Sequence, residues 1–156
     1  MKVAAIVLAA GGATRFGRPK QLLELGGENL VRRACRVAHE AGCEPVVTVL
    51  GAHAEAIQTA GLASDVRVVV NEAWQDGMGA SLAAGVRALG EKDLDAVLVL
   101  LVDQPGVGAN TLRVLIEKSR QPGVSIVLCD SGGATGPPAL FGRRHFAALS
   151  KLEGDQ

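Results

Sequence analysis

A short segment near the N-terminus combines glycines and cations in a pattern that suits phosphate. The loop from Leu8 to Lys20 contains three glycines, two arginines and a lysine, and it follows an apolar run, residues 3–8, that predicts a buried strand. Glycines let backbone N–H groups approach a ligand closely, and a strand leading into a glycine-rich basic turn is a common phosphate-binding design. We therefore expect Arg15 and Lys20 to contact phosphate. The alternative is a flexible basic turn without a ligand.

This loop matches neither of the two best-known phosphate-binding fingerprints. The dinucleotide fingerprint G-x-G-x-x-G fails because Ala13 stands where its second glycine is required. A Walker A loop needs Lys followed by Ser or Thr after its last glycine, whereas Gly17 is followed by Arg18 and Pro19. The sequence therefore indicates a different kind of phosphate loop.

A carboxylate directly follows the most hydrophobic run of the chain, residues 96–102. Asp103 stands at the end of this predicted strand and is followed by Gln104 and Pro105. A carboxylate there is poorly solvated unless it is paired, and Mg²⁺ in proteins takes one or two carboxylates and completes its shell with water and phosphate. We expect Asp103 to hold Mg²⁺. An aspartate that caps the following turn is the alternative.

A third loop, residues 71–79, also carries chemistry. Gly77 and Gly79 allow close backbone approach to a ligand, and Ser81 is predicted to open a helix whose N-terminus can face an anion. Trp74, the only tryptophan, is interpreted as a packing anchor in preference to a stacking wall. The three histidines are interpreted as surface residues, and no Ser/His/Asp or Cys/His arrangement favours covalent catalysis.

The elements that must position these residues alternate between strand and helix. Continuous apolar strands separated by amphipathic helices predict a Rossmann-like three-layer α/β/α fold with a mostly parallel central sheet. In such sheets ligands bind beyond the carboxyl ends of the strands, where the three loops lie. The predicted strands, all taken as buried, are 3–8, 45–50, 66–70, 96–102 and 124–129, and the predicted helices are 30–41, 54–60, 80–89, 111–119 and 143–152, with Asn29 as the cap of the first.

Composition excludes several classes of protein. The 156 residues fit one domain, and a formal net charge of zero without a Lys/Arg run argues against nucleic-acid binding. No apolar stretch reaches the roughly 18 residues of a membrane span. Three cysteines without C-x-x-C spacing argue against a zinc site or a disulfide framework. We expect a cytoplasmic enzyme with buried free thiols.

Four motifs, in order, resemble those of the MobA-like nucleotidyltransferases, and most closely those of the molybdenum cofactor cytidylyltransferases. The resemblance runs from residue 3 to the end of the chain. Its motifs are the loop from Leu8 to Lys20, Asn71…Trp74…Gly77-Met78-Gly79-Ala80-Ser81, Asp103-Gln104-Pro105, and Gly136-Pro137-Pro138-Ala139-Leu140-Phe141 with Gly154-Asp155.

The resemblance implies transfer of a nucleotidyl group from an NTP with release of pyrophosphate. It implies catalytic roles for Arg15, Lys20 and Asp103, and Mg²⁺ bound by Asp103 and Asp155. Ala10 stands where guanylyl-transferring relatives carry Gly, which favours CTP as donor and molybdopterin as acceptor, with a molybdoenzyme or its chaperone as a further partner. The implied nucleotide-binding residues are Leu8, Ala9, Ala10, Gly11, Gly12, Arg15, Lys20, Asn71, Gly77, Gly79 and Ser81.

Two departures from the family pattern leave alternatives open. Pro137 stands where stricter cytidylyltransferases carry His, and the chain ends at Gln156 where the family continues for a few tens of residues. We therefore expect a single nucleotidyltransferase domain, 1–156, that lacks its C-terminal segment. A transferase with a sugar phosphate or methylerythritol phosphate as acceptor remains open, since Pro19-Lys20-Gln21 also occurs in methylerythritol-phosphate cytidylyltransferases. A non-catalytic accessory protein for molybdoenzyme maturation remains open too.

Overall fold

The two uninterrupted apolar runs, residues 3–9 and 96–101, form neighbouring central strands of one sheet. In the computed structural model, β1 (Val3–Ala9) lies between β6 (Val46–Leu50) and β8 (Ala96–Leu101) and is parallel to both. Every side chain of β1 and β6 is buried. A strand covered on both faces needs an apolar residue at nearly every position, which is why these runs show no alternation.

The sheet extends to six strands in the order β7-β6-β1-β8-β10-β9. Strand β7 (Val66–Val70) pairs parallel with β6 at one edge, while β10 (Ala134–Gly142) runs antiparallel to both β8 and the other edge strand, β9 (Ile126–Ser131). The mostly parallel, Rossmann-like sheet predicted from the sequence is thereby confirmed. The sequence did not reveal β10, because prolines are depleted in strands and this one contains two; its pairing with β9 shifts register between Gly136 and Ala139.

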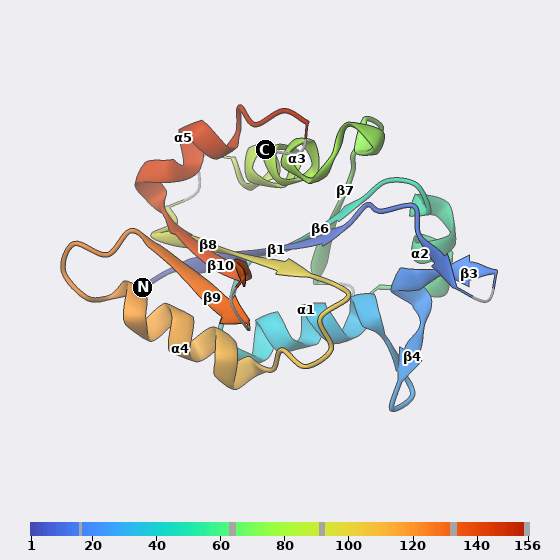
Figure 1. Ribbon diagram of the computed structural model, residues 1–156, viewed down its shortest axis with the longest axis horizontal. Coiled ribbons are helices and arrows are strands. Elements are labelled where there is room, and N and C mark those ends of the chain that lie inside the picture. The colour runs from blue at the N-terminus through green and yellow to red at the C-terminus, as the bar shows by residue number, and fades with distance from the viewer. Residues whose placement is uncertain (16, 63–64, 91–92, 132–133, 155–156) are drawn as a thin grey trace.

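Helices cover both faces and complete the three layers (Figure 1). Helices α1 (Leu30–Glu40) and α4 (Ala109–Ser119) pack on one face with Ile57 of α2 (Ala54–Ala60). Helices α3 (Met78–Leu89) and α5 (Phe146–Leu149) pack on the other.

Helix α1 shows how the pattern of the chain determines such packing. Its buried residues recur at helical spacing along one side. The Asn29 side chain accepts a hydrogen bond of 2.8 Å from the backbone N–H of Arg32, which confirms the predicted cap.

Three predicted elements differ from the structure in burial or type, and others, such as the helix predicted over 80–89, differ in their bounds. The strand predicted over 124–129 as buried is the edge strand β9, in which Ile126 and Leu128 are 44% and 46% exposed. Residues 66–70 are not a buried strand: β7 is an edge strand in which Val68 and Val70 are 39% and 46% exposed, and an apolar run cannot reveal whether a neighbour will cover it. The predicted helix 143–152 is instead the short 3₁₀ turn η3 (Arg143–His145) and the single-turn α5. The chain then folds back along α3, where the Arg87 guanidinium donates to the carbonyl of Ser150.

Short elements complete the chain: the hairpins β2 (Thr14–Arg15)–β3 (Arg18–Pro19) and β4 (Glu24–Leu25)–β5 (Glu28–Asn29), and the 3₁₀ turns η1 (Lys20–Leu22) and η2 (Trp74–Asp76). The structure describes residues 1–15, 17–62, 65–90, 93–131 and 134–154. Within these ranges, every helix is too short or too polar to cross a bilayer.

Candidate functional site

The parallel register brings the predicted loops to one edge of the sheet, and a cavity of about 410 Å³ lies there. Leu8 of β1 is level with Leu101 of β8 and Val49 of β6, so the chain leaves all three strands at the same edge. Segments far apart in the sequence therefore line one cavity. The predicted site residues among its walls are Leu8, Ala9, Ala10, Gly11, Gly12, Lys20, Gly77, Ser81 and Asp103.

The glycine-rich loop turns its carbonyl groups into the protein. The Gln21 side-chain amide donates to the carbonyls of Ala9 and Gly11, at 2.9 and 2.8 Å. The carbonyl of Ala10 accepts from the backbone N–H of Ala52 at 3.2 Å, and the carbonyl of Gly12 lies 3.1 Å from Nε2 of His53. Four successive carbonyls thus have partners that hold the loop in shape.

The backbone donors of the same loop have no such partners. Within the described ranges, the N–H groups of Gly11, Gly12 and Ala13 donate to no protein acceptor. Successive backbone N–H groups that are free in a concave loop form an anion-binding nest. The loop therefore has backbone donors available to a ligand, and phosphate binding there stays a prediction.

The ring of Trp74 packs so closely against Gly12 that this position leaves little room for a side chain. A Cβ on Gly12 would lie 3.0 Å from two atoms of the Trp74 ring, and a Cβ on Gly51 would lie 2.6 Å from Cβ of Trp74. The tryptophan packs against the core beneath α3 and lines the cavity with its remaining surface. The interpretation of Trp74 as a packing anchor is confirmed, because its ring fills the space that two missing side chains leave.

A pair of opposite charges stands at the mouth of the cavity. Nζ of Lys20 lies 3.3 Å from Oδ2 of Asp103, and the two side chains are 39% and 45% exposed. An exposed ion pair of this kind contributes only about 0–1 kcal/mol. A ligand that offers each group a stronger partner can therefore open it at little cost.

The third predicted loop contributes less directly. The sequence predicted that Ser81 opens the helix that follows this loop, and this prediction is wrong. Helix α3 begins at Met78, so Ser81 lies within its first turns. The Ser81 hydroxyl accepts a hydrogen bond of 3.0 Å from Nδ2 of Asn71. Asn71 and the buried Gly79 do not line the cavity; Asn71 supports Ser81 from behind.

Two predicted site residues fall outside what the structure describes. Arg15 contributes its backbone to β2, but its side chain lies outside the described part of the chain, as does Asp155. Over the described ranges, no three His, Cys, Asp or Glu side chains gather into a metal-binding group. Asp103 is therefore the described carboxylate of this cavity.

Two functional neighbours were not identified from the sequence. Gln21 is 3% exposed and lines the cavity; its signal is a polar residue inside the otherwise apolar segment 21–23. His53 was interpreted as a surface residue, yet its ring contacts the carbonyl of Gly12. Both contacts depend on how the loop folds over β6, which the local sequence does not specify.

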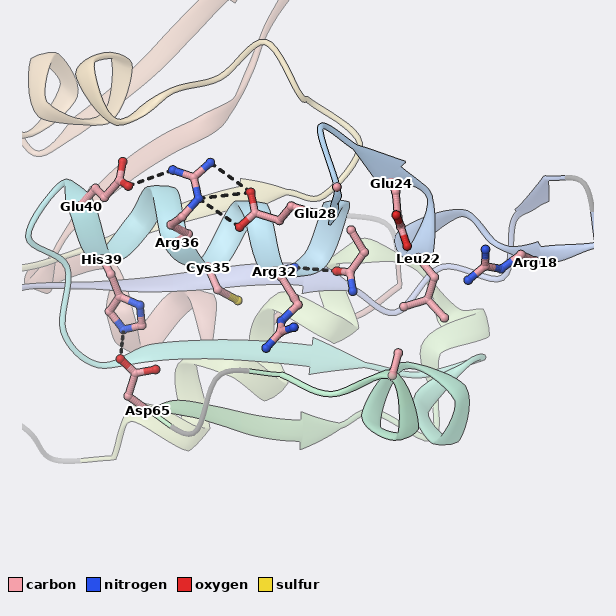
Figure 2. Close-up of a pocket in the computed structure, with 13 residues that line it drawn as sticks. Arg18, Leu22, Glu24, Glu28, Arg32, Cys35, Arg36, His39, Glu40 and Asp65 are labelled. Carbon is pink, nitrogen blue, oxygen red and sulfur yellow. Dashed lines mark hydrogen bonds and ion pairs between the residues drawn. The ribbon is translucent and has the colours of Figure 1, made fainter.

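A second, larger hollow of about 690 Å³ lies beside α1 (Figure 2). Its charged side chains are largely paired: Arg36 bonds Glu28 at 3.0 Å and Glu40 at 2.8 Å, and Nε2 of His39 lies 3.5 Å from Asp65. On its floor, burial raises the pKa of the Cys35 thiol. We name this one the charged hollow and take the smaller cavity, which the predicted loops line, as the candidate site.

The mostly parallel sheet, with helices on both faces and a glycine-rich loop that lines a cavity after β1, defines a Rossmann-like α/β protein. The chain belongs to the MobA-like NTP transferase domain family, whose model matches residues 5–156. The family that the four motifs resemble is therefore confirmed. Its members are enzymes that use an NTP as substrate.

Curated relatives carry different names. Nicotine blue oxidoreductase of Paenarthrobacter nicotinovorans is 43% identical over 123 residues, which cover 78% of this chain and 58% of the relative. A probable molybdenum cofactor guanylyltransferase of Opitutus terrae is 37% identical over 107 residues, 69% of this chain and 50% of the relative. The chain thus spans about half the length of these proteins.

Solved structures match the whole fold. The crystal structure of Rv0371c from Mycobacterium tuberculosis H37Rv has a TM-score of 0.84 at 32% identity and covers 99% of this chain and 78% of its own. The complex of that protein with manganese has a TM-score of 0.82 at 31% identity, with the same coverage. Use of a divalent cation in this family is consistent with that complex.

Proposed function

We propose that this protein is a Mg²⁺-dependent nucleotidyltransferase that transfers CMP from CTP to the terminal phosphate of molybdopterin and releases pyrophosphate. One observation carries the proposal: unpartnered backbone N–H groups from Gly11 to Ala13 share a cavity with the Lys20–Asp103 ion pair. Such a cavity offers donors to a polyphosphate and a carboxylate to its cation. We propose that residues 1–156 form one such domain and act in the cytoplasm.

The proposed chemistry is an in-line attack by the acceptor phosphate on the α-phosphorus of CTP. This reaction depends on positioning and charge stabilisation more than on a side-chain nucleophile, which fits a cavity whose described lining residues include no nucleophilic triad. The loop N–H groups and Lys20 would hold the triphosphate, together with Arg15. Lys20 would stabilise the charge that develops on the leaving pyrophosphate.

Asp103 fits the requirement of a magnesium site beside phosphates. Mg²⁺ needs only one or two protein carboxylates, because water and phosphate complete its shell. Asp103 lies at the cavity mouth, and we assign Asp155 as the second acidic contact. When bound, the ion would neutralise phosphate charge in the transition state. Lys20 would leave Asp103 for the triphosphate as the nucleotide and its cation enter.

Base and acceptor rest on weaker features. Ala10, in the wall of the cavity, favours CTP by resemblance to the cytidylyl-transferring enzymes. The relative from Opitutus terrae is named a guanylyltransferase, so GTP is the first competitor to test. We propose molybdopterin as the acceptor because both the cytidylyl- and the guanylyl-transferring enzymes act on the molybdenum cofactor, with a molybdoenzyme or its chaperone as the next partner. A sugar phosphate and methylerythritol phosphate are the alternative acceptors to test.

Thermal unfolding with nucleotides tests the proposal without an acceptor. A ligand that binds only the folded state at 100 times its Kd adds about 2.7 kcal/mol of stability. We expect a rise in Tm with CTP and Mg²⁺ that exceeds the rise with GTP or ATP. A larger shift with GTP would correct the base, and no shift with any nucleotide would contradict the proposal.

Nicotine blue oxidoreductase, at 43% identity, supports a second candidate: a redox enzyme that holds a nucleotide-containing cofactor in the same cavity. The same loop would then bind the pyrophosphate of a dinucleotide. Adding NADH and NADPH to the thermal panel separates the two functions. Stabilisation by a dinucleotide alone, without pyrophosphate release from CTP, would favour the redox function.

A further inference from the structure

We propose that Gln21 is the positioning residue that holds the glycine-rich loop after β1 in the conformation that receives phosphate. This role rests on the proposed function of the cavity and gives a structural task to Gln21, which the sequence shows only as the last residue of Pro19-Lys20-Gln21. Gln21 lies on η1, directly after Lys20, and its side chain reaches back beneath the end of β1.

Two hydrogen bonds carry the inference. A primary amide has two N–H donors, and both of those of Gln21 are used: one on the carbonyl of Ala9 at 2.9 Å and one on that of Gly11 at 2.8 Å. Because both partners are acceptors, the NH₂ end of the side chain must face the loop. One side chain thus ties the last residue of β1 to the turn that follows it.

These bonds determine where the loop donors point. A trans peptide directs the C=O of one residue and the N–H of the next in opposite directions. With the carbonyls of Ala9 and Gly11 held toward Gln21, the N–H groups of Ala10 and Gly12 point away from it. Of the three nest donors, Gln21 therefore orients the N–H of Gly12, while Ala52 and His53 hold the peptide groups that carry the N–H of Gly11 and of Ala13.

The amide oxygen of Gln21 indicates that this position carries glutamine for its N–H donors. Oε1 of Gln21 is buried and has no hydrogen-bond partner within the described part of the chain. A buried acceptor without a partner is unfavourable, and an apolar side chain of the same size avoids that cost. The segment nevertheless carries an amide between Lys20 and the buried Leu22.

The test compares Gln21→Met, which keeps the length of the side chain but removes its donors, with Leu22→Val, which loosens the same turn without touching the loop carbonyls. Binding of CTP and of inorganic pyrophosphate, each with Mg²⁺, is measured by calorimetry, and Tm is measured for each variant. We expect Gln21→Met to raise both Kd values about 10- to 100-fold, as loss of a supporting hydrogen bond commonly does. Gln21→Asn, which is one methylene shorter, should give a smaller rise.

A second measurement follows the loop itself. In the wild type, pyrophosphate should shift the amide resonances of Gly11, Gly12 and Ala13, and in Gln21→Met these shifts should be lost. Unchanged Kd values for Gln21→Met, or an equal rise for Leu22→Val, would overturn the positioning role and leave the proposed function standing. A wild type that binds neither probe would overturn both.

Discussion

The two hollows of this molecule differ in what their walls leave unsatisfied. The charged hollow beside α1 is larger and carries more ionisable side chains, but Arg36 and His39 have carboxylate partners there. The candidate site is smaller and carries few charges, yet its glycine-rich loop presents backbone donors that have no acceptor in the described structure. The successive backbone donors beside the Lys20–Asp103 pair, more than volume or charge, therefore identify the candidate site.

The largest expected difference between the two regions concerns their carboxylates. Asp103→Ala removes the proposed metal contact, and loss of such a transition-state contact commonly costs about 10²–10³ in rate, or about 3–4 kcal/mol. Asp65→Ala removes a carboxylate of the charged hollow and should leave the rate unchanged. Pyrophosphate release from CTP with Mg²⁺ measures both. Equal rates for Asp103→Ala and the wild type would refute the metal assignment.

The next difference concerns cations. Lys20→Ala should weaken CTP binding about 10- to 100-fold, because a hydrogen bond to a charged group contributes about 1.5–3 kcal/mol. Arg32→Ala is the matched control: Arg32 lines the charged hollow, and within the described chain no ion pair or side-chain hydrogen bond engages its guanidinium. Calorimetric titration with CTP and Mg²⁺ measures the Kd values. An equal loss in Arg32→Ala would mean that general positive charge, not the cavity, attracts the nucleotide.

The smallest expected effect is one of stability alone. Arg36→Ala removes two exposed ion pairs of the charged hollow, so the free energy of unfolding should fall by about 1 kcal/mol and Tm by about 2–4 °C. The difference from the wild type should shrink in 1 M salt, where the Debye length is only about 3 Å. Thermal unfolding at both salt concentrations, with and without CTP, checks this. A change in CTP-dependent stabilisation would show that the two hollows are coupled.

Much of the fold was readable from local pattern. The buried runs of β1 and β8, the spacing of α1 and its Asn29 cap each follow from nearby residues alone. The failures occurred where a local pattern was ambiguous. Two prolines concealed β10, and the valines of β7 did not reveal that the strand lies at an edge, because exposure depends on neighbours that lie elsewhere in the chain.

The candidate site divides in the same way. Glycines, Lys20 and Asp103 were identified because their residue types and their positions after strands carry the signal. Gln21 and His53 were missed, since a glutamine in an apolar segment and a histidine before a helix have no chemistry until the loop carbonyls reach them. Spacing also placed Ser81 at the start of a helix that begins three residues earlier.

By itself the sequence determined the family, the class of sheet and the loops that line the candidate site, because apolar periodicity and glycine-rich motifs are local properties. The tertiary structure alone decided that Lys20 and Asp103, 83 positions apart, meet at 3.3 Å, and that one glutamine holds two loop carbonyls. It also decided which of the two hollows presents successive backbone N–H groups without a partner in the described structure. Such contacts depend on strand order and register, which pack distant segments together and which no local pattern encodes.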